Sequence, residues 1–478
     1  MSIGEPLVLR RPLGDDPPKA TLYYGENVTE ALRRLPAKSV QMVCTSPPYW
    51  GLRSYGVQEQ IWGGNPECDH DWFGDDGYTG HRGNRGQVPQ TKWKAVDVYP
   101  QATTPVEQAV CRKCGAWKGC LGLEPTPEGY VKHMVEVFRE VRRTLRDDGT
   151  VWLNLGDTYM SHPANDLSGL GGKEGSRIKG TDGYEDSLTV HHRPNPTDVG
   201  LKDKDLVGIP WRVALALQDD GWYLRSDIIW AKPNPMPSSA RDRPTKAHEY
   251  IFLLTKQPQY FYDAEAIREP YEGLGKPRAF AKKGNDDRGD TGRMYEADDK
   301  GGRNKRTVWT LPTQPYPGAH FAVWPPKLVE PMILAGTSKK GCCSKCGAPW
   351  VRQVERGREP HPDRWSKTND GVQFDPDANA YSDGVGLGVS ITSKTVGWEP
   401  SCECEGAEVQ PCVVMDIFSG SATTGMIAMA HGRDYVGLDL SADYLRLAES
   451  RILGLAAPTT DDDDSDNPLL DILGEEDR

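Results

Sequence analysis

The residues best suited to chemistry near the N-terminus are Ser46-Pro47-Pro48-Tyr49, which follow the apolar, strand-like run 40–44. Proline has no N–H group and a fixed φ, so the two prolines cannot continue a central strand. The backbone must leave the sheet in a stiff turn that carries a hydroxyl, an aromatic ring and carbonyls without strand partners. Such a turn could bind a flat substrate with an exocyclic amino group, whose N–H groups donate to these oxygens while Tyr49 stacks on the ring. An ordinary strand-ending turn explains the same residues.

A second motif lies near the C-terminus, where the apolar run 413–418 breaks at Ser419-Gly420 and a helix is predicted to begin near Thr423. A turn of this kind lets backbone N–H groups approach a ligand closely. Asp439 follows the next predicted strand, 23 residues beyond Asp416, where an acid binds ribose hydroxyls in nucleotide-binding βαβ units. The candidate cofactor residues here are Asp416, Phe418, Gly420, Ser421, Thr423, Thr424 and Asp439.

Two groups of cysteines have the spacing of structural zinc sites. The first is Cys68-x-His70 with Cys111-x-x-Cys114-Gly, and the second is Cys343-x-x-Cys346-Gly with Cys402-x-Cys404. Four thiolate or imidazole ligands from two turns suit tetrahedral zinc, and the glycine after each second cysteine permits a tight turn. Either Cys342 or Cys343 could be the ligand, and Cys343 gives the two-residue spacing. Reduced thiols without a metal are the alternative.

Ser46-Pro47-Pro48-Tyr49 resembles the catalytic tetrapeptide of DNA amino-methyltransferases, which methylate cytosine N4 or adenine N6 with S-adenosylmethionine (SAM). The run 416–424 resembles the SAM loop of that family, Asp-Pro-Phe-x-Gly-Ser-Gly-Thr-Thr, with Ile417 for Pro and Ala422 for Gly. The tetrapeptide comes before the SAM loop, which is the permuted order of one class. The resemblance implies an α/β, Rossmann-like SAM methyltransferase fold with a mostly parallel sheet and, in this chain, zinc-ribbon-like insertions.

The resemblance also implies two further cofactor contacts. Gly25-Glu26 stands where the family usually has Gly-Asp, whose acid lies near the SAM adenine, so Glu26 takes that role. The run 320–326, which includes Phe321, resembles the segment that packs against the methionine end of SAM. Ala422 restricts the backbone conformations of the SAM loop more than glycine would, and this restriction is expected to affect SAM affinity.

The pattern of elements predicts how the chain is divided. Residues 20–56 and 126–262 form the catalytic half, and residues 319–340 and 413–455 form the SAM-binding half. Residues 57–125 and 341–412 are predicted zinc-knuckle insertions, and the second contains a polar excursion over 355–395. Predicted helices cover 28–35, 131–145, 206–218, 327–335 and 442–453, with strands at 150–155, 222–230 and 249–254. The last two strands resemble the terminal hairpin of the family sheet.

Residues 263–318 are a candidate DNA-recognition segment. From 268 to 306 the chain is polar and contains eleven Lys or Arg residues with interleaved Phe280 and Tyr295, which suit phosphate contacts. Five aspartates dilute this charge, so a solvated surface loop explains the same composition.

Charge and hydropathy do not exclude a nucleic-acid partner. The net charge is −12, but the acidic end after Asp461 carries much of it, and residues 456–478 are predicted to be a disordered, solvating tail. No stretch is apolar over the length of a membrane span, and the N-terminus lacks signal-peptide character, so we expect a cytoplasmic protein. The expected partner is double-stranded DNA, with a cognate restriction nuclease possible but not indicated by any residue.

The expected mechanism uses hydrogen bonds from the amino group to Ser46 and to the Pro47 carbonyl, which localise the nitrogen lone pair for in-line methyl transfer. The base is flipped and stacked on Tyr49. Serine is shorter than the Asp or Asn that adenine-directed relatives more often carry, which favours cytosine N4 over adenine N6. Two alternatives are a non-catalytic zinc-ribbon DNA-binding protein and a methyltransferase acting on RNA or protein.

Overall fold

The structure is a computed structural model of the 478-residue chain. It describes residues 5–10, 17–51, 57–72, 109–160, 196–269, 303–314, 323–360 and 389–454. In this part of the chain no helix combines the length and the apolarity needed to cross a membrane.

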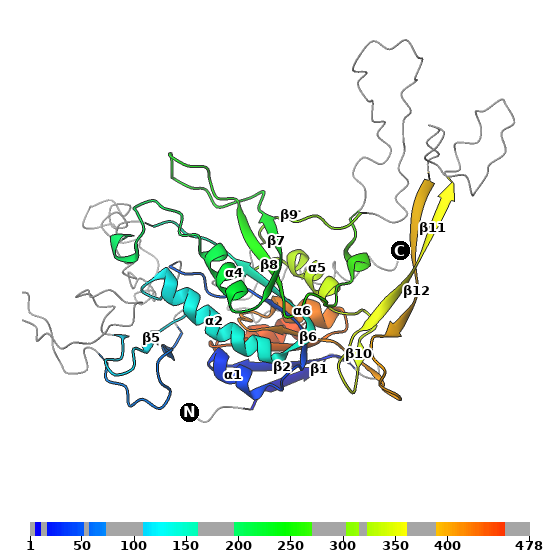
Figure 1. Ribbon diagram of the computed structural model, residues 1–478, viewed down its shortest axis with the longest axis horizontal. Helices are drawn as coiled ribbons and strands as arrows, with labels where there is room; N and C mark the ends of the chain where they lie inside the picture. Colours follow the sequence, from blue (N-terminus) through cyan, green and yellow to red (C-terminus); the bar gives the residue numbers. More distant parts are fainter. Residues whose placement is uncertain are drawn as a thin grey trace, which may run out of the picture.

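A nine-stranded sheet organises the molecule, in the order β1-β2-β15-β14-β3-β6-β8-β7-β9 (Figure 1). Strands β2, β15, β14, β3 and β6 are parallel neighbours, and β8 then pairs antiparallel with both β6 and β7. The strands of the sheet are β1 (Leu7–Arg10), β2 (Lys19–Tyr24), β3 (Val40–Thr45), β6 (Leu145–Leu155), β7 (Tyr223–Ala231), β8 (His248–Thr255), β9 (Val308–Thr310), β14 (Val413–Asp416) and β15 (Asp434–Asp439).

Helices cover both faces of the sheet, as expected for a parallel sheet whose strands are buried on both sides. One core packs α1 (Val28–Arg34), α2 (Pro127–Thr144) and α4 (Ile209–Asp219) against one face. The other core packs α5 (Pro326–Gly336), α6 (Thr423–Ala430) and α7 (Tyr444–Leu453) against the opposite face. Every residue of β3 is buried, because this strand lies at the centre of both cores. The predicted Rossmann-like α/β fold is therefore confirmed.

Local signals set several helix starts. Asn27 caps α1 through hydrogen bonds from the backbone N–H groups of Thr29 and Glu30, and Thr126 caps α2 by accepting from Gly129 N. The predicted start of the last helix at residue 442 is wrong: α7 begins at Tyr444, after Asp443. The predicted terminal hairpin is also not terminal, because β9 adds a parallel edge strand beside β7.

Each cysteine-bearing insertion folds around a short hairpin. We call residues 57–72 and 109–125, which contain β4 (Gln60–Trp62) and β5 (Trp117–Gly119), the first knuckle. Residues 341–349 and 401–412, with β10 (Cys342–Cys343) and β13 (Val409–Gln410), form the second knuckle. In Figure 1 the labels β5 and β10 mark these knuckles on opposite sides of the view.

The predicted polar excursion inside the second insertion is partly a β-ribbon. Strands β11 (Trp350–Pro360) and β12 (Val389–Pro400) pair antiparallel and project from the body (Figure 1). Arg352 fixes the base of this ribbon by donating to both carboxylate oxygens of Asp263. The apolar and polar residues of the ribbon alternate too weakly for the sequence to have predicted it.

Candidate active site

The tetrapeptide Ser46-Pro47-Pro48-Tyr49 leaves the sheet directly after β3, at the edge where the parallel strands end, which we call the carboxyl edge. Neighbouring elements hold this turn from outside. The Tyr130 hydroxyl of α2 donates to the Pro48 carbonyl at 2.9 Å. The first knuckle contributes the Glu124 carbonyl, which accepts from Trp50 Nε1 at 2.9 Å, and the Gly122 carbonyl, which accepts from Gly51 N at 2.8 Å. The turn is thus rigid by sequence and by its contacts.

The Tyr49 side chain lies in a polar cluster that the sequence analysis did not find. Its hydroxyl donates to Glu249 Oε2 at 2.8 Å, and it accepts from Ser46 Oγ at 3.2 Å and from Asn154 Nδ2 at 2.7 Å. Gly156 lets the tyrosine ring lie against the end of β6, since a Cβ atom there would be 2.5 Å from the ring. Asn154 and Glu249 come from β6 and β8, so only the register of the folded sheet brings them to Tyr49.

Asp416 ends β14, and its carboxylate binds residues of the predicted SAM loop. Its carboxylate accepts hydrogen bonds from Thr45 Oγ1 and Thr424 Oγ1, both at 2.7 Å, and from Phe418 N at 3.1 Å. Burial raises the pKa of Asp416 to about 6, although these three donors act to lower it. The Thr45 contact joins the loop to the end of β3, so the two predicted motifs meet at the carboxyl edge.

Asp439, at the end of β15, holds the glycine-rich turn. One carboxylate oxygen accepts from Gly420 N at 2.7 Å and the other from Ser441 N at 2.9 Å. Burial raises the pKa of Asp439 to about 6 as well. Gly420 has a φ of +48°, and a Cβ atom added to it would have no heavy atom within 4 Å. The open side of this turn therefore fits a bound cofactor.

The rest of the loop is fixed by a buried arginine that the sequence analysis missed. Arg451 of α7 donates to the Ser421 carbonyl at 3.0 Å and to Thr423 Oγ1 at 2.9 Å. Ala422 precedes α6 with a φ of +57°, the left-handed conformation that a glycine adopts without strain. The side chains of Thr423 and Thr424 are thus engaged within the protein, and they shape the loop.

Glu26 lies close to the same turn, because Gly25 N donates to the Asp439 carbonyl at 2.9 Å. Glu26 Oε1 pairs with Arg34 at 2.6 Å, while Oε2 is buried and has no partner among the described residues. A buried carboxylate oxygen without a donor is costly, and it fits a ligand group that donates to it. Phe321 lies outside the described residues.

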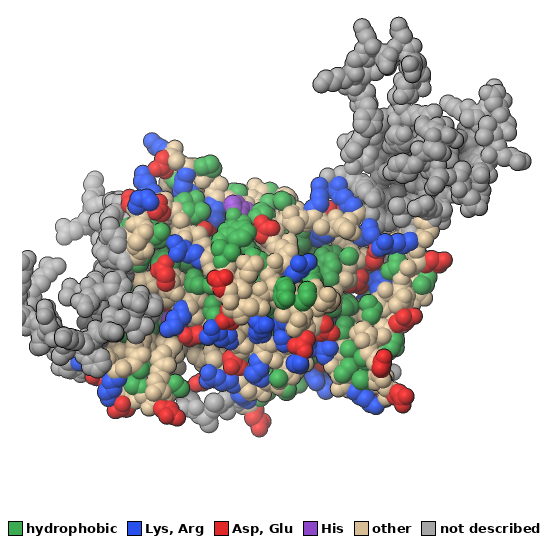
Figure 2. Space-filling model, viewed as in Figure 1, with side chains coloured by type: hydrophobic (Ala, Val, Ile, Leu, Met, Phe, Trp, Pro, Cys, Tyr) green, Lys and Arg blue, Asp and Glu red, His purple; other side chains and the backbone are tan. Residues whose placement is uncertain are grey.

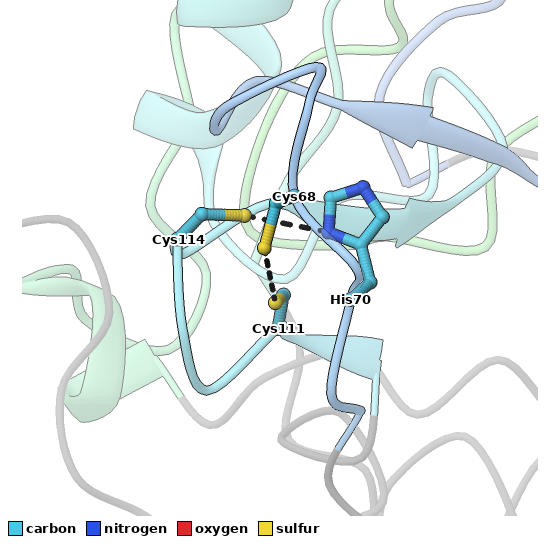
Figure 3. Close-up of side chains that lie close together, drawn as sticks. All are labelled: Cys68, His70, Cys111 and Cys114. Atoms are coloured by element: carbon cyan, nitrogen blue, oxygen red, sulfur yellow. Dashed lines mark hydrogen bonds between the residues drawn. The ribbon is translucent and has the colours of Figure 1, made fainter.

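The structure brings together all four residues of the first predicted metal site (Figure 3). The Sγ atoms of Cys68 and Cys111 are 3.9 Å apart, and Cys114 Sγ is 3.4 Å from His70 Nδ1. Tetrahedral zinc with Zn–S distances of about 2.3 Å places two sulfurs about 3.8 Å apart, so this geometry fits zinc. Burial acts to raise the pKa of Cys111, but the backbone N–H of Cys114 and the His70 ring lower it to about 6, which favours the thiolate.

The second predicted site also assembles, from Cys343, Cys346, Cys402 and Cys404, with all ligand atoms within 4.8 Å of one another. The backbone N–H groups of Cys346 and Lys345 lower the pKa of Cys343 to about 6. Cys342 lies outside this cluster. Its thiol lies instead 3.5 Å from both Gln41 Nε2 and the Pro411 carbonyl, so the geometry favours Cys343 as the ligand.

Only the two ends of the candidate recognition segment 263–318 are described. There Glu269 binds the basic side chains of Arg303, Lys305 and Arg306. Most of the basic and aromatic residues predicted to contact phosphates, and the acidic tail 456–478, lie outside the described residues. On the described surface in view, basic and acidic side chains are interspersed (Figure 2).

Comparison with known proteins identifies the family of this chain. A family model described as DNA methylase matches residues 40–343 and 412–450, which include both the tetrapeptide and the SAM loop. The chain belongs to the N6/N4 DNA methylase family. It is 33% identical to the Type II methyltransferase M.XycI of Xanthomonas campestris pv. cyanopsidis over 94% of this chain and 90% of that protein.

A second relative gives the same result. The Type II methyltransferase M.Cfr9I of Citrobacter freundii is 32% identical over 91% of this chain and 88% of its own length. Among solved structures, the PvuII DNA methyltransferase (cytosine-N4-specific) aligns with 91% of this chain and 86% of its own, at 14% identity and a TM-score of 0.41.

The protein is thus a DNA methyltransferase that uses SAM as methyl donor. This assignment removes the non-catalytic DNA-binding protein and the RNA or protein methyltransferase that the sequence analysis left open. The carboxyl edge of the sheet is also where open α/β folds bind their ligands.

Proposed function

We propose that this methylase transfers the methyl group to the exocyclic N4 of a cytosine in double-stranded DNA. The observation that carries the proposal is Ser46, a short hydroxyl residue at the first position of the tetrapeptide. An amino group bonded to Ser46 has to approach the backbone more closely than one bonded to a longer carboxylate or amide side chain. A pyrimidine can come this close more easily than the larger purine ring.

The proposed mechanism assigns one task to each residue of the turn. Bound SAM supplies an electrophilic methyl group on its sulfonium. The hydroxyl of Ser46 and the carbonyl of Pro47 accept the two N–H groups of the target, which localises the nitrogen lone pair. Pro47 and Pro48 fix the turn, and the Tyr49 ring stacks on the base. The chain's contribution is orientation at near-attack distance, which needs no covalent intermediate.

The cofactor residues follow from the loop geometry. We assign the ribose hydroxyls to Asp439 and the adenine end to Glu26, whose Oε2 is buried without a partner among the described residues. Gly420 and Phe418 line the turn, Asp416 positions it, and Phe321 takes the methionine end by family resemblance. Ser421, Thr423 and Thr424 act mainly by maintaining the loop, as their contacts to Arg451 and Asp416 support.

The amino group of a paired base lies inside the duplex, so the target base must be flipped into the site. Residues 263–318 are the proposed recognition segment. The relatives are Type II methyltransferases by name, which motivates a cognate nuclease acting at the same sequence. Sequencing of methylated DNA would identify that sequence.

We also propose one structural zinc ion in each knuckle, because each cluster supplies four ligands and leaves no open coordination position. Neither metal takes part in methyl transfer. Metal analysis should find about two zinc ions per chain, and a value below about one would contradict both sites.

Nucleoside analysis tests the target base. DNA methylated by the purified protein is digested to nucleosides and weighed by mass spectrometry. The proposal expects N4-methylcytosine, whereas N6-methyladenine alone would overturn the base assignment and leave the family assignment intact.

A pair of variants tests the site assignment. Tyr49→Ala should remove most of the methylation while SAM binds nearly as in the wild type. Asp439→Ala should instead weaken SAM by about 1.5–3 kcal/mol, the range of charge-assisted hydrogen bonds. Near-normal turnover of Tyr49→Ala on duplex DNA would show that the proposed base pocket is wrong.

A further inference from the structure

The hydrogen bonds of the polar cluster around Tyr49 all run in one direction, from donor to acceptor. The Ser46 hydroxyl donates to Tyr49 Oη at 3.2 Å, and the Tyr49 hydroxyl donates to Glu249 Oε2 at 2.8 Å. The series therefore begins at the residue nearest the substrate and ends at a carboxylate, which only accepts when it is ionised. Because the Ser46 proton points toward Tyr49, the lone pairs of Ser46 Oγ are free to accept from the target amino group.

Two cations and an amide surround the carboxylate at the end of this series. Lys232, which follows β7, forms an ion pair with Glu249 Oε1, and both side chains are largely buried. Lys246 of the same β7–β8 connection adds a second positive charge nearby. Asn154 Nδ2 donates to Glu249 Oε2 at 3.0 Å as well as to Tyr49. The contacts with Lys232 and Asn154 orient Oε2 of Glu249 toward Tyr49 Oη.

One atom of the cluster points to a missing ligand. Asn154 Oδ1 is buried and has no hydrogen-bond partner among the described residues, although Nδ2 of the same amide is fully used. Buried acceptors are rarely left unpaired, so this oxygen marks a position where a bound molecule donates an N–H group. The same amide bonds Tyr49 Oη and Glu249 Oε2, so this oxygen places the polar cluster beside a ligand site.

We propose that Ser46, Tyr49 and Glu249 form a proton relay that removes the proton lost by the target nitrogen during methylation. This inference rests on the proposed role of Ser46 as an acceptor for the amino group. It assigns Glu249, a residue outside the tetrapeptide, as the final proton acceptor, and Asn154 as the residue that positions both Tyr49 and Glu249.

Every bond, electron pair and proton in the proposed reaction is accounted for by the relay. The nitrogen lone pair forms the N–CH₃ bond while the S–CH₃ bond breaks and its electron pair stays on sulfur. The methylated nitrogen is then cationic and releases one proton to Ser46 Oγ. Ser46 passes its own proton to Tyr49 Oη, Tyr49 passes its proton to Glu249 Oε2, and the protonated carboxyl later releases it to water. Ser46 and Tyr49 end neutral, as they began.

A purely structural role for Glu249 is the competing explanation, since its pair with Lys232 joins the ends of β7 and β8. Three variants separate the two roles. Glu249→Gln and Tyr49→Phe each break the relay, and Tyr49→Phe keeps the ring that packs on Gly156. Lys232→Met breaks the same ion pair as Glu249→Gln but leaves the contact between Tyr49 and Glu249.

The measurement is the single-turnover rate of methyl transfer from labelled SAM to duplex DNA, together with the binding of DNA and SAM. Glu249→Gln and Tyr49→Phe should each lower the rate by about 100-fold, the lower end of general-base effects, with both affinities nearly unchanged. The double variant should be no slower than either single variant, because both break one series. Lys232→Met should lose less than about 10-fold. Asp220→Asn, which breaks a distant pair with Arg139, is the control with wild-type rate.

Three outcomes would overturn the relay: a wild-type rate for Glu249→Gln or for Tyr49→Phe, multiplicative losses in the double variant, or an equal loss in Lys232→Met and Glu249→Gln. Thermal melting of each variant checks that it is folded. The assay counts methyl groups on either base, so an N6-methyladenine product would overturn the cytosine proposal without deciding the relay.

Discussion

The two knuckles share the sequence Cys-x-x-Cys-Gly, yet they contact opposite ends of the sheet. The first knuckle follows β3 and holds the end of the Ser46–Tyr49 turn, where the proposed catalytic residues lie, through the Glu124 and Gly122 carbonyls. The second knuckle precedes β14 and contacts the edge where the parallel strands begin, which we call the amino edge. There Gln41, near the start of β3, donates to the Gly347 carbonyl at 3.1 Å, and Arg146 donates to the Cys346 carbonyl. The two knuckles therefore support different parts of the protein. The first supports the carboxyl edge, which carries the candidate active site, and the second supports the amino edge.

The carboxylates at the two edges also differ in the direction of their pKa shifts. At the carboxyl edge, burial raises the pKa of Asp416 and of Asp439 to about 6, so keeping them ionised at neutral pH opposes folding. At the amino edge, hydrogen bonds from Lys256 and Lys38 lower the pKa of Asp147 to about 2, so its charge favours folding. The carboxyl edge thus holds groups arranged for a ligand at the expense of stability, a common property of functional sites.

Removal of one proposed metal ligand from each knuckle should show the largest difference between the two knuckles. Cys114→Ser and Cys404→Ser should each lose one zinc ion. We expect Cys114→Ser to lower the methylation rate by about 100-fold, because the catalytic turn shifts when its support is lost. Cys404→Ser should lower the melting temperature but keep the rate per folded molecule. Equal rates in the two folded variants would show that the first knuckle does not support the turn.

A subtler pair of variants leaves both proposed metal sites intact. Trp50→Phe removes the donor to the buried Glu124 carbonyl, at a cost of about 1–3 kcal/mol, and should reduce the methylation rate as well as stability. Arg146→Met removes the donor to the Cys346 carbonyl and should reduce stability only. The methylation rates of the two variants are compared at a temperature where both are folded. A reduced rate in Arg146→Met but not in Trp50→Phe would contradict the prediction.

The pH dependence distinguishes the edges through their carboxylates. In the role proposed for Asp439, its carboxylate accepts ribose hydroxyls well only when ionised, so SAM affinity should fall by about tenfold per pH unit below pH 6. Asp439→Asn should bind SAM weakly and with most of this dependence removed. The sign for stability is opposite at the two edges. The raised pKa values of Asp416 and Asp439 make the protein less stable as pH rises from about 4 to 6.

Asp147 has the reverse effect, because its lowered pKa contributes stability that is lost as pH falls from about 4 to 2. This contribution is small, since the Asp147 side chain is about half exposed. Isothermal calorimetry with SAM and chemical denaturation across pH measure these effects. A SAM affinity that stays constant between pH 7 and 5 would contradict the assignment of Asp439.

The smallest effect concerns two residues with left-handed backbone. Ala422→Gly, at the carboxyl edge, should relieve strain of about 1–2 kcal/mol and lose about 0.5–1 kcal/mol to the greater freedom of glycine when unfolded. The net gain is then about 0–1.5 kcal/mol. Lys38→Gly, with φ of +56° at the amino edge, should gain less because its pair with Asp147 is lost. Chemical denaturation of both variants gives the answer, and a destabilised Ala422→Gly would show that the alanine methyl contributes more by packing than it costs in strain.

The sequence predicted those parts of the site whose information is local. Two prolines end β3, a glycine turn follows β14, and the paired Cys-x-x-Cys-Gly runs predict the two cysteine clusters from their spacing. Glu249, Asn154 and Arg451 were not predicted, because each acts through the register of a strand or the packing of a helix distant in sequence. The edge strands β1 and β9 and the β11–β12 ribbon were missed because they are short or weakly patterned, and pairing partners decide such strands.

The strand order has a consequence for biosynthesis. Strands β14 and β15 lie between β2 and β3, although they are made roughly 400 residues later. At about 5–20 residues per second, the nascent chain holds two unpaired strand edges for about 20–80 s before the inserted strands leave the ribosome. Until then the turn at Ser46 has no SAM loop beside it. A newly made chain therefore cannot methylate DNA before nearly all of it has been translated, and chains truncated before residue 413 lack the centre of their own sheet.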